Sequence, residues 1–434
     1  MSKIFSAPRG TADILPAEMF LWQDIQDTAR QIFANYNYRE IQTPVFEETE
    51  LFTRSMGKTS DVVQKQMLNL QSQKKSDAGD IHVGELSLRP EGTASVVRAY
   101  IENGLKQKEN ISKLFYIGPM FRGERPQKGR LRQFHQIGVE VIGPGANHPY
   151  IDAEVIALNV NLLNAFGLKE FELKINTLGS LEDKKNLSKG LRKLLSDKIS
   201  KLCPDCQNRF ERNVFRILDC KNEACCQVVH DLKISDTYLS EESRAYFAQV
   251  KEALDGLGIK YLVCHDLVRG LDYYTHTVFE ITGFSLGSQD AISAGGRYDN
   301  LVSQLGGPEI PAVGFALGIE RIILAMGKSR EPIIQRPNTY IVSLDEKSFK
   351  KGFEILNILR SMDISSDMNF HVSSMKSQMR SADKSGASSV IILGGSELEK
   401  QCVSLKDMET GKQEEISIKN NDYSILIDRL RERQ

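Results

Sequence analysis

This 434-residue chain has no long apolar run and no excess of charge of either sign, and its number of cysteines is odd. Apolar stretches such as Ile322–Met326 fall far short of a membrane span, so we expect no membrane protein. Lys and Arg number 56 against 57 Asp and Glu, which excludes a globally basic nucleic-acid binder and leaves only local patches for RNA. The seven cysteines predict free thiols in a reducing cytoplasm, and Met1–Phe5 shows no secretory signal.

The composition that is present, with 41% hydrophobic and 26% charged residues, is typical of a globular protein. The length predicts two or three domains. We expect a first domain over 1–328, a linker over 329–337 and an α/β domain over 338–434. Residues from about 180 to 262 have helical periodicity, dense charge and five cysteines, which predicts a mostly helical insert within the first domain.

Periodicity predicts several elements. Residues 16–36 have the spacing of an amphipathic helix, and 113–142 form two strand-like runs around a long basic loop, which indicates an antiparallel hairpin. Residues 71–80, polar with Gly79, predict a second hairpin loop. In the tail, strands at 339–344 and 390–394 alternate with helices at 349–362, 375–384 and 421–432.

The segment 111–136 is the most informative part of the sequence. It holds six basic residues against one acid, Glu124. The basic residues are Lys113, Arg122, Arg125, Lys128, Arg130 and Arg132. Arginines on a hairpin loop are suited to a polyphosphate, because a guanidinium group can bind two phosphate oxygens. The alternative is a solvated charged loop.

Other nucleotide-binding patterns fail. Gly57-Lys58-Thr59 resembles the end of a P-loop, but Phe52 stands where a glycine is needed. No GxGxxG follows a strand, and His82–Gly84 lacks the lysine-rich loop that would accompany a class I synthetase signature. ATP, if bound, is therefore not held by a parallel-sheet fold.

Five short segments carry a specific combination of arginine, glycine, acidic and tyrosine residues, in order along the chain. They are Pro8–Asp13, Arg89–Thr93, Phe121–Pro126, Leu267–Tyr274 and Gly314–Arg321. Together they resemble histidyl-tRNA synthetase, a family of class II aminoacyl-tRNA synthetases, over essentially the whole chain. The resemblance implies an α+β catalytic domain built on an antiparallel sheet with helices, and a C-terminal α/β anticodon-binding domain with a mixed sheet. It also implies ATP, L-histidine and tRNA(His) as partners, and a homodimer formed around residues 40–56.

The resemblance assigns the ATP site to residues of three segments. Arg122 matches the α-phosphate ligand, Arg321 contacts the γ-phosphate region, and Arg269 reaches the α-phosphate and the substrate carboxylate. Glu124 and Arg125 complete the ATP site, and Mg²⁺ is expected to bridge the phosphates. Preformed cations suit this chemistry, because negative charge spreads in the transition state. No general base is needed, because the attacking carboxylate is already ionised.

The histidine pocket implied by the resemblance has a carboxylate, Glu140, and a hydroxyl, Tyr274, for the two imidazole nitrogens. The residues placed around the amino and carboxylate groups are Glu91, Gly92, Thr93, Gln136, Arg269 and Tyr273. Two alternatives stay open. Glu91 would also suit the start of a helix after Pro90, and the two tyrosines would also suit a core.

The cysteines of the insert have zinc-knuckle spacing. Cys203 and Cys206 are followed by Cys220 and then by Cys225 or Cys226, which could complete four thiolates around Zn²⁺. The flanking residues indicate a helix rather than a zinc ribbon. Free reduced thiols are the alternative, favoured because the family that the chain resembles needs no zinc.

Two rival functions remain. A synthetase-like paralogue of the family senses histidine while regulating a phosphoribosyltransferase, but it typically lacks the anticodon domain and departs from the Arg269–Tyr274 pattern. A synthetase-like domain in a stress kinase would need kinase motifs, and the sequence has none. We therefore expect an enzyme that forms histidyl-adenylate and then charges tRNA with histidine.

Overall fold

The chain forms two compact units, residues 1–332 and 333–434. The computed structural model describes residues 4–57, 60–71, 85–127, 129–232, 234–283, 291–327 and 336–433. No helix within these ranges is long and apolar enough to cross a membrane. Most of the loop predicted at 71–80 and most of the linker predicted at 329–337 lie outside the described residues.

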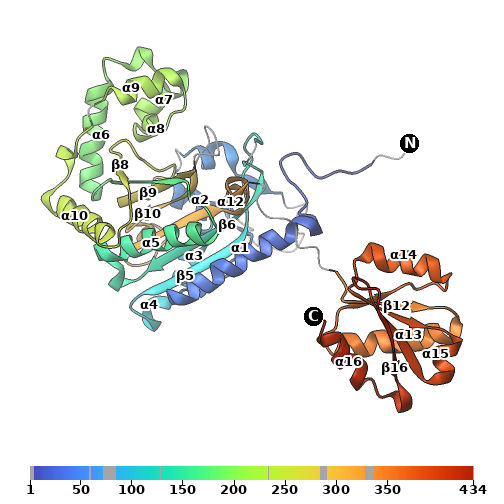
Figure 1. The fold of residues 1–434 in the computed structure, drawn as a ribbon. Coiled ribbons are helices and arrows are strands. Elements are labelled where there is room, and N and C mark those ends of the chain that lie inside the picture. The colour runs from blue at the N-terminus through green and yellow to red at the C-terminus, as the bar shows by residue number, and fades with distance from the viewer. Residues whose placement is uncertain are drawn as a thin grey trace, which may run out of the picture. The chain divides into compact units, whose positions relative to one another are not determined.

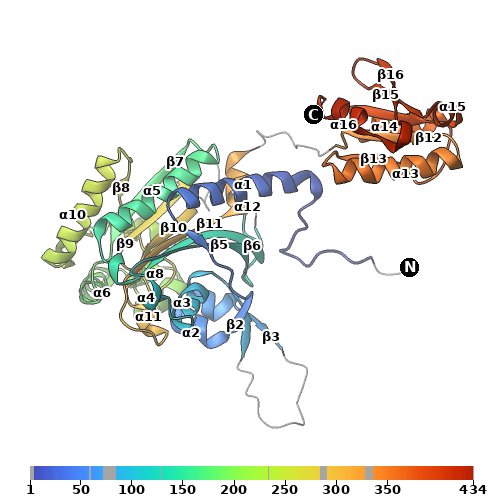
Figure 2. The same ribbon diagram turned by 90° about the horizontal axis from the view of Figure 1, so that it is seen from below.

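The first helix, α1 (Pro16–Asn35), forms where the apolar spacing predicts it. Pro16 stands in the first turn, where its missing N–H breaks no helical hydrogen bond. The buried side chains are Trp22, Ile25, Ala29 and Phe33. Because they recur every three or four residues, they form one apolar face. This face packs in the same core as α5 (Pro149–Ala165), which lies beside α1 in Figure 2.

An eight-stranded sheet is the centre of the first unit (Figure 1). Its order is β1-β5-β6-β11-β10-β9-β7-β8, antiparallel throughout except for the two edge strands β1 and β8. The strands are β1 (Arg39–Glu40), β5 (Ser112–Phe121), β6 (Gln133–Ile142), β7 (Phe171–Thr177), β8 (Leu262–Val263), β9 (Thr275–Gly283), β10 (Ala291–Arg297) and β11 (Ala312–Gly318). This arrangement confirms the predicted antiparallel catalytic sheet.

Alternation along β6 separates two layers. Val139 and Val141 point into an apolar core that also contains residues of α1, α5, α10 (Glu241–Gly256) and α12 (Ile319–Met326). Glu140 lies between the two valines and therefore points to the opposite face, because side chains alternate along a strand. That opposite face carries the candidate site.

The hairpin predicted at 113–142 is formed by β5 and β6, which pair from Ser112↔Ile142 to Phe121↔Gln133. Of the six basic residues, Arg122, Arg125, Arg130 and Arg132 lie in the connecting loop, Lys113 lies in β5, and Lys128 lies outside the described residues. A tight turn closes this loop, because Gln127 and Arg130 exchange backbone hydrogen bonds of 3.0 and 2.9 Å. The turn decides which arginines of the loop face the sheet.

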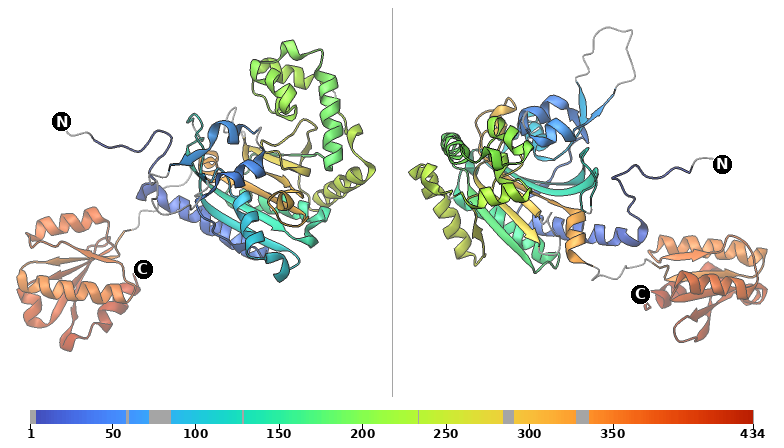
Figure 3. Two further views of the ribbon diagram at one scale, coloured as in Figure 1. Left: turned by 180° about the vertical axis from the view of Figure 1, so that it is seen from behind. Right: turned by 90° about the horizontal axis from the view of Figure 1, so that it is seen from above.

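The insert leaves the sheet after β7 and returns at β8 as a group of helices at one side of the unit (Figures 1 and 3). Before α10 these are α6 (Leu181–Leu195), α7 (Pro204–Arg212), α8 (Phe215–Leu218) and α9 (Glu223–His230). Ser180 and Asp183 form a capping box at the start of α6. The Asp183 carboxylate also accepts hydrogen bonds from Ser240 and Ser243 at the start of α10, so one side chain joins two helix starts.

A small lobe beside the large sheet combines a three-stranded antiparallel sheet with short helices. Its elements are β2 (Phe46–Glu48), α2 (Thr49–Met56), η1 (Val62–Gln66), β3 (Leu68–Leu70), β4 (Leu86–Leu88), α3 (Thr93–Glu102) and α4 (Leu105–Lys108). Helix α3 is almost fully buried and brings its N-terminus to the site face.

The second unit is a five-stranded mixed sheet with helices, in the order β13-β12-β14-β15-β16. Its elements are β12 (Thr339–Ser343), α13 (Glu346–Ser361), β13 (Ser366–Met368), α14 (Met375–Ser385), β14 (Ser389–Leu393), α15 (Gly395–Lys400), β15 (Cys402–Asp407), β16 (Gln413–Ser417) and α16 (Ser424–Arg431). The mixed sheet confirms the predicted α/β fold. The sequence made no prediction for the β15–β16 hairpin.

A fully buried ion pair joins β10 to α5. Arg297 Nε lies 3.0 Å from Asp152 Oδ1, and neither side chain is exposed. Asp152→Asn leaves the guanidinium group with Asp299, 3.0 Å from its Nη1, as the remaining carboxylate partner. We expect it to lower the free energy of unfolding by about 3 kcal/mol, measured by urea denaturation of the full chain. The control is Glu50→Gln at the exposed pair with Arg54, where a change below about 0.5 kcal/mol is expected. Equal losses in both variants would contradict this prediction.

Candidate active site

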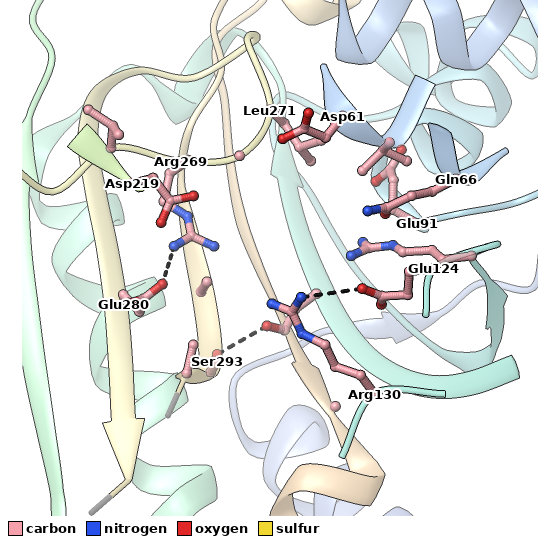
Figure 4. A pocket seen from close by; sticks show the side chains of 18 of the residues that line it. Asp61, Gln66, Glu91, Glu124, Arg130, Asp219, Arg269, Leu271, Glu280 and Ser293 are labelled. Carbon is pink, nitrogen blue, oxygen red and sulfur yellow. Dashed lines mark hydrogen bonds and ion pairs between the residues drawn. The ribbon is translucent and has the colours of Figure 1, made fainter. Parts of the chain in front are cut away.

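A cleft of about 820 Å³ opens on the face of the large sheet toward which Glu140 points. Residues of β6, β10 and β11 form its floor, and the start of α3, the loop before β9 and helices of the insert contribute to its walls. Figure 4 shows Glu124 and Arg130 on one side of the cleft and Arg269 and Glu280 on the other. Charged groups from distant parts of the sequence therefore meet in one site.

Three guanidinium groups gather on one wall: Arg122 after β5, Arg130 in the hairpin loop and Arg321 in the first turn of α12. Burial lowers the pKa values of Arg122 and Arg321. Repulsion from Arg130 acts in the same direction at both, although Glu124 and Glu91 act against it at Arg122. Cations that destabilise one another in this way are stabilised by a shared anion. The wall is therefore suited to phosphate groups.

Backbone contacts hold two of these cations in place. Arg122 Nε donates to the carbonyl of Pro90 at 3.0 Å, and its guanidinium group lies 5.1 Å from the centre of the Phe134 ring. Arg321 donates to the carbonyls of Gly129 and Ala291. The cations are thus largely preorganised, which strengthens electrostatic stabilisation of a reacting phosphate.

Arg269 lies on the opposite wall, in the loop that leads into β9. It donates to the carboxylate of Glu280, and its side chain is 18% exposed. Burial lowers the pKa of Arg269, but the Glu280 carboxylate outweighs burial, so the pKa is raised. Nε of Arg269 is buried without a hydrogen-bond partner among the described residues. One donor of this cation therefore remains available for a ligand.

Glu140 is 1% exposed and lies behind the cleft floor. Its Oε1 accepts the Thr93 hydroxyl at 2.6 Å, and its Oε2 accepts the Tyr298 hydroxyl. Burial raises the pKa of Glu140 to about 8, although these two hydrogen bonds act in the opposite direction. Gly314 lines the cleft next to this carboxylate. A Cβ atom at position 314 would lie 2.1 Å from Glu140 Oε2, so a residue with a side chain would not fit there.

Glu91 caps α3, as the alternative interpretation of the sequence expected. Its two carboxylate oxygens accept the N–H groups of Thr93 at 2.6 Å and Ala94 at 2.9 Å. Burial raises the pKa of Glu91 against these backbone hydrogen bonds. Glu91 also lines the cleft, so the capping position does not remove it from the site.

Three tyrosines line the cleft together. The rings of Tyr273 and Tyr274 lie 4.6 Å apart, and Tyr298 contacts both rings edge-on. All three also belong to a buried apolar cluster, so core packing and cleft lining are combined. Lys184 of α6 donates to the carbonyls of Asp272 at 3.0 Å and Tyr274 at 2.7 Å, which anchors the loop carrying Arg269.

Most of the predicted site residues meet in this cleft. The predicted residues that line it are Glu91, Thr93, Arg122, Glu124, Gln136, Arg269, Tyr273, Tyr274 and Arg321. Gly92 is the N-cap residue of α3, packed against Tyr116, where a Cβ would lie 2.3 Å from the ring. The Oε1 atom of Gln136 is buried and has no partner within the described part of the chain, so it is available to a ligand.

Arg125 is the predicted site residue that the structure places elsewhere. It is exposed and is not among the cleft-lining residues, whereas Arg130 lines the cleft and pairs with Glu124 at 3.3 Å. The turn between Gln127 and Arg130 directs the later arginine inward. The prediction did not include Glu280, which also lines the cleft. The sequence did offer a signal for Glu280, because it is a charged residue between two apolar residues, Phe279 and Ile281, that are buried.

Helices of the insert form a wall that the sequence did not reveal. Arg209 of α7 and Arg216 of α8 each place a guanidinium nitrogen 2.9 Å from Asp61 Oδ2, and all three residues line the cleft. Asn213 donates to Asp272 at 2.8 Å. The insert is thereby joined to the small lobe and to the loop that carries Arg269.

Comparison with known proteins agrees with this geometry. Residues 10–322 match the histidyl-tRNA synthetase family, and residues 338–422 match the anticodon binding domain family. The histidine–tRNA ligase of Halothermothrix orenii is 48% identical over 417 residues, covering 95% of this chain and 97% of that protein. The histidine–tRNA ligase of Bacillus subtilis is 43% identical over 419 residues, with coverages of 95% and 96%.

A solved structure shows the same architecture. The apo histidyl-tRNA synthetase of S. aureus superimposes with a TM-score of 0.78 at 36% identity, covering 98% of this chain and 100% of that one. Both the sequence matches and the fold extend over nearly the full length. The chain therefore belongs to the histidyl-tRNA synthetase family.

Proposed function

We propose that this chain is a histidine–tRNA ligase whose cleft activates L-histidine with ATP and then transfers it to the 3′-terminal adenosine of tRNA(His). One observation carries the proposal: Arg122, Arg130 and Arg321 line the cleft close enough to repel one another, and Arg269 lies on the side of the cleft opposite Arg130 (Figure 4). A polyphosphate between the walls would offset the burial and the repulsion that lower the pKa values of Arg122 and Arg321. Family membership supports the same activity.

In the first step a carboxylate oxygen of histidine attacks the α-phosphorus of ATP. An O–P bond forms to give histidyl-adenylate, and the bond to the leaving pyrophosphate breaks. Arg122 and Arg269 would bind the α-phosphate, while Arg130 and Arg321 would bind the leaving phosphates. These groups stabilise charge as it spreads over the phosphate oxygens, so no proton transfer is required.

The residues present fit an Mg²⁺ ion that arrives with ATP. Mg²⁺ in such sites is bound by phosphates and one or two carboxylates rather than by a protein cage. Glu124 and Glu280 line opposite sides of the cleft, and either carboxylate would hold the ion together with the bound phosphates. In the described ranges, no three-carboxylate cluster is found that would compete with this arrangement. When bound, the ion would neutralise part of the phosphate charge.

Histidine would lie over Gly314, with its imidazole directed to Glu140 and Tyr274. Because Gly314 has no side chain, the imidazole ring of the substrate could reach Glu140. A side chain at position 314 would clash with the Glu140 carboxylate. The Thr93 and Tyr298 hydroxyls orient Glu140, and the free Oε1 of Gln136 would accept from the substrate amino group. A pocket that offers buried polar partners rejects rings that cannot pair with them.

The pH dependence of histidine recognition tests this assignment. Glu140 must be ionised to accept an imidazole N–H, and its pKa of about 8 makes it mostly neutral at pH 7. We therefore expect kcat/KM for histidine in ATP–pyrophosphate exchange to rise with pH and level off above about pH 8. The imidazole of the substrate titrates at about pH 6.5, below this rise, but its α-amino group titrates at about pH 8, so variants of Glu140 are needed to assign the rise.

Two variants separate Glu140 from other titrating groups. In Glu140→Gln the rise of kcat/KM near pH 8 should disappear. The value of kcat/KM for histidine should fall by about 10- to 100-fold, with little change in KM for ATP. Tyr298→Phe removes a hydrogen-bond donor that lowers the pKa of Glu140, so the rise of kcat/KM in this variant should move to higher pH. A rise that is unchanged in Glu140→Gln would exclude the proposed role.

Further parts of the proposal concern partners. The second unit would bind the anticodon end of the tRNA, which its match to an anticodon binding domain supports. The active form would be a cytoplasmic homodimer. Size-exclusion chromatography with light scattering tests the oligomeric state, and a mass of one chain would contradict the dimer.

A further inference from the structure

Four cysteines of the insert converge on one point, although they come from three separate segments. Their Sγ atoms all lie within 4.8 Å of one another, and the cluster consists of Cys203, Cys206, Cys220 and Cys225. The Sγ atoms of Cys203 and Cys220 are 3.9 Å apart, and all four cysteines are free rather than paired in disulfides. In a tetrahedral site with Zn–S bonds of about 2.3 Å the sulfurs are about 3.8 Å apart, so the observed spacing is close to that of a tetrathiolate site.

Two helices begin at the cluster. Cys203 is the N-cap residue of α7 and Cys206 lies in its first turn, while Cys225 lies in the first turn of α9. Backbone N–H groups near these helix starts point toward the sulfurs. The backbone N–H of Cys203 donates to Cys225 Sγ at 3.2 Å, and that of Asn222 donates to Cys220 Sγ at 3.5 Å.

A cation also lies close to the sulfurs. Arg209 Nη1 is 3.9 Å from Cys206 Sγ, so it would offset part of the double negative charge of a zinc tetrathiolate. The neighbouring Cys226 is exposed and lies outside the cluster, which resolves the choice that the sequence left open.

The cluster lies where α7 and α9 meet a shared apolar core. Cys206 is the one buried residue of α7, and it packs in the same cluster as Cys225 and Val229 of α9. A structural metal ion held at such a point adds its binding free energy to that of folding. Helix α7 carries Arg209, which reaches across to Asp61 at the cleft wall. An ion at the cluster would therefore fix the wall that the insert contributes.

From this geometry we infer that Cys203, Cys206, Cys220 and Cys225 bind one structural Zn²⁺, which joins α7 to α9 beside the cleft. Binding releases the remaining thiol protons and forms four Zn–S bonds without any redox change. The site is closed, because all four ligands come from the protein. It would stabilise the insert and take no part in the chemistry of the adenylate, so it does not depend on the proposed function.

The test is the metal content of the full-length protein, purified under reducing conditions and passed over a chelating resin. Mass spectrometry of the elements should find about one zinc per chain in the wild type and in Cys226→Ser, and almost none in Cys206→Ser. Cys226→Ser is a matched control, because it removes a thiol from the same helix as Cys225. Less than about 0.1 equivalent of zinc in the folded wild type would overturn the inference. Stoichiometric iron in place of zinc would also overturn it.

A second measurement needs no variant that could fail to fold. A thiol-blocking mercurial added to the wild type should release one zinc per chain into a coloured chelator, and this release should accompany the modification of four thiols beyond those of Cys226, Cys264 and Cys402. Cobalt added to the metal-free protein should give the visible bands of a tetrahedral thiolate site. Four thiols that react freely without release of metal, in a protein that gives no cobalt spectrum, would exclude the site.

Discussion

Arg269→Ala should reduce kcat/KM for histidine in ATP–pyrophosphate exchange by about 1,000-fold, or about 4 kcal/mol of transition-state stabilisation. The variant loses the cation that faces the three-arginine wall, and Glu280, which forms an ion pair with it, is then left without that cation in a partly buried position. Both effects act on the reacting phosphate and on the substrate carboxylate. The loss should therefore appear in kcat as well as in KM, because this contact strengthens as charge develops.

Arg269→Lys is the matched variant for this prediction. It keeps the charge beside Glu280 but loses the planar group that binds two oxygens and the free Nε donor. We expect partial activity, between that of the wild type and that of Arg269→Ala, with similar thermal unfolding midpoints for both variants. Activity of Arg269→Ala within tenfold of the wild type would refute the assignment of this residue to the reaction.

Arg122→Ala should lower the rate of adenylate formation by about 100- to 1,000-fold. Arg122 is held by the Pro90 carbonyl and by the Phe134 ring, so it is already directed at the cleft before substrates bind. Water that fills the space left by the Arg122 side chain would not supply the positive charge that this cation directs at the phosphate. Single-turnover formation of histidyl-adenylate measures the effect directly, because it separates chemistry from product release.

The hairpin loop offers its own control for this prediction. Arg125→Ala removes the same charge three residues further along the chain, but the Arg125 side chain is exposed and does not line the cleft. We expect its loss of activity to be within about threefold, since a distant exposed charge is screened. Arg130→Ala should resemble Arg122→Ala more closely. Equal losses at Arg122 and Arg125 would show that the loop takes a different arrangement when ATP binds.

The sequence was sufficient for the elements with strong apolar periodicity. Helix α1 and the β5–β6 hairpin bury several large side chains, so their patterns stand out. Strand β16 buries only Ile416 among five residues, and this signal is too weak to predict a strand. The β15–β16 hairpin is stabilised by its pairing with β14, which a local pattern cannot reveal.

The site was partly predictable for a related reason. The resemblance identified segments, and nine of the predicted residues line the cleft. It could not choose between Arg125 and Arg130, because a turn of the backbone decides which of them faces the sheet. It also missed the wall made by Arg209, Arg216 and Asp61, since these residues are brought together only by tertiary folding.

Lys184 gives the insert a direct influence on the substrate loop. Its ammonium group is bound by two carbonyls of the loop that carries Arg269, so α6 cannot shift without breaking these hydrogen bonds. Any macromolecule that displaces α6 on docking would change the affinity for the amino acid. By thermodynamic reciprocity, occupancy of the cleft by the amino acid would change the affinity for that macromolecule by the same factor.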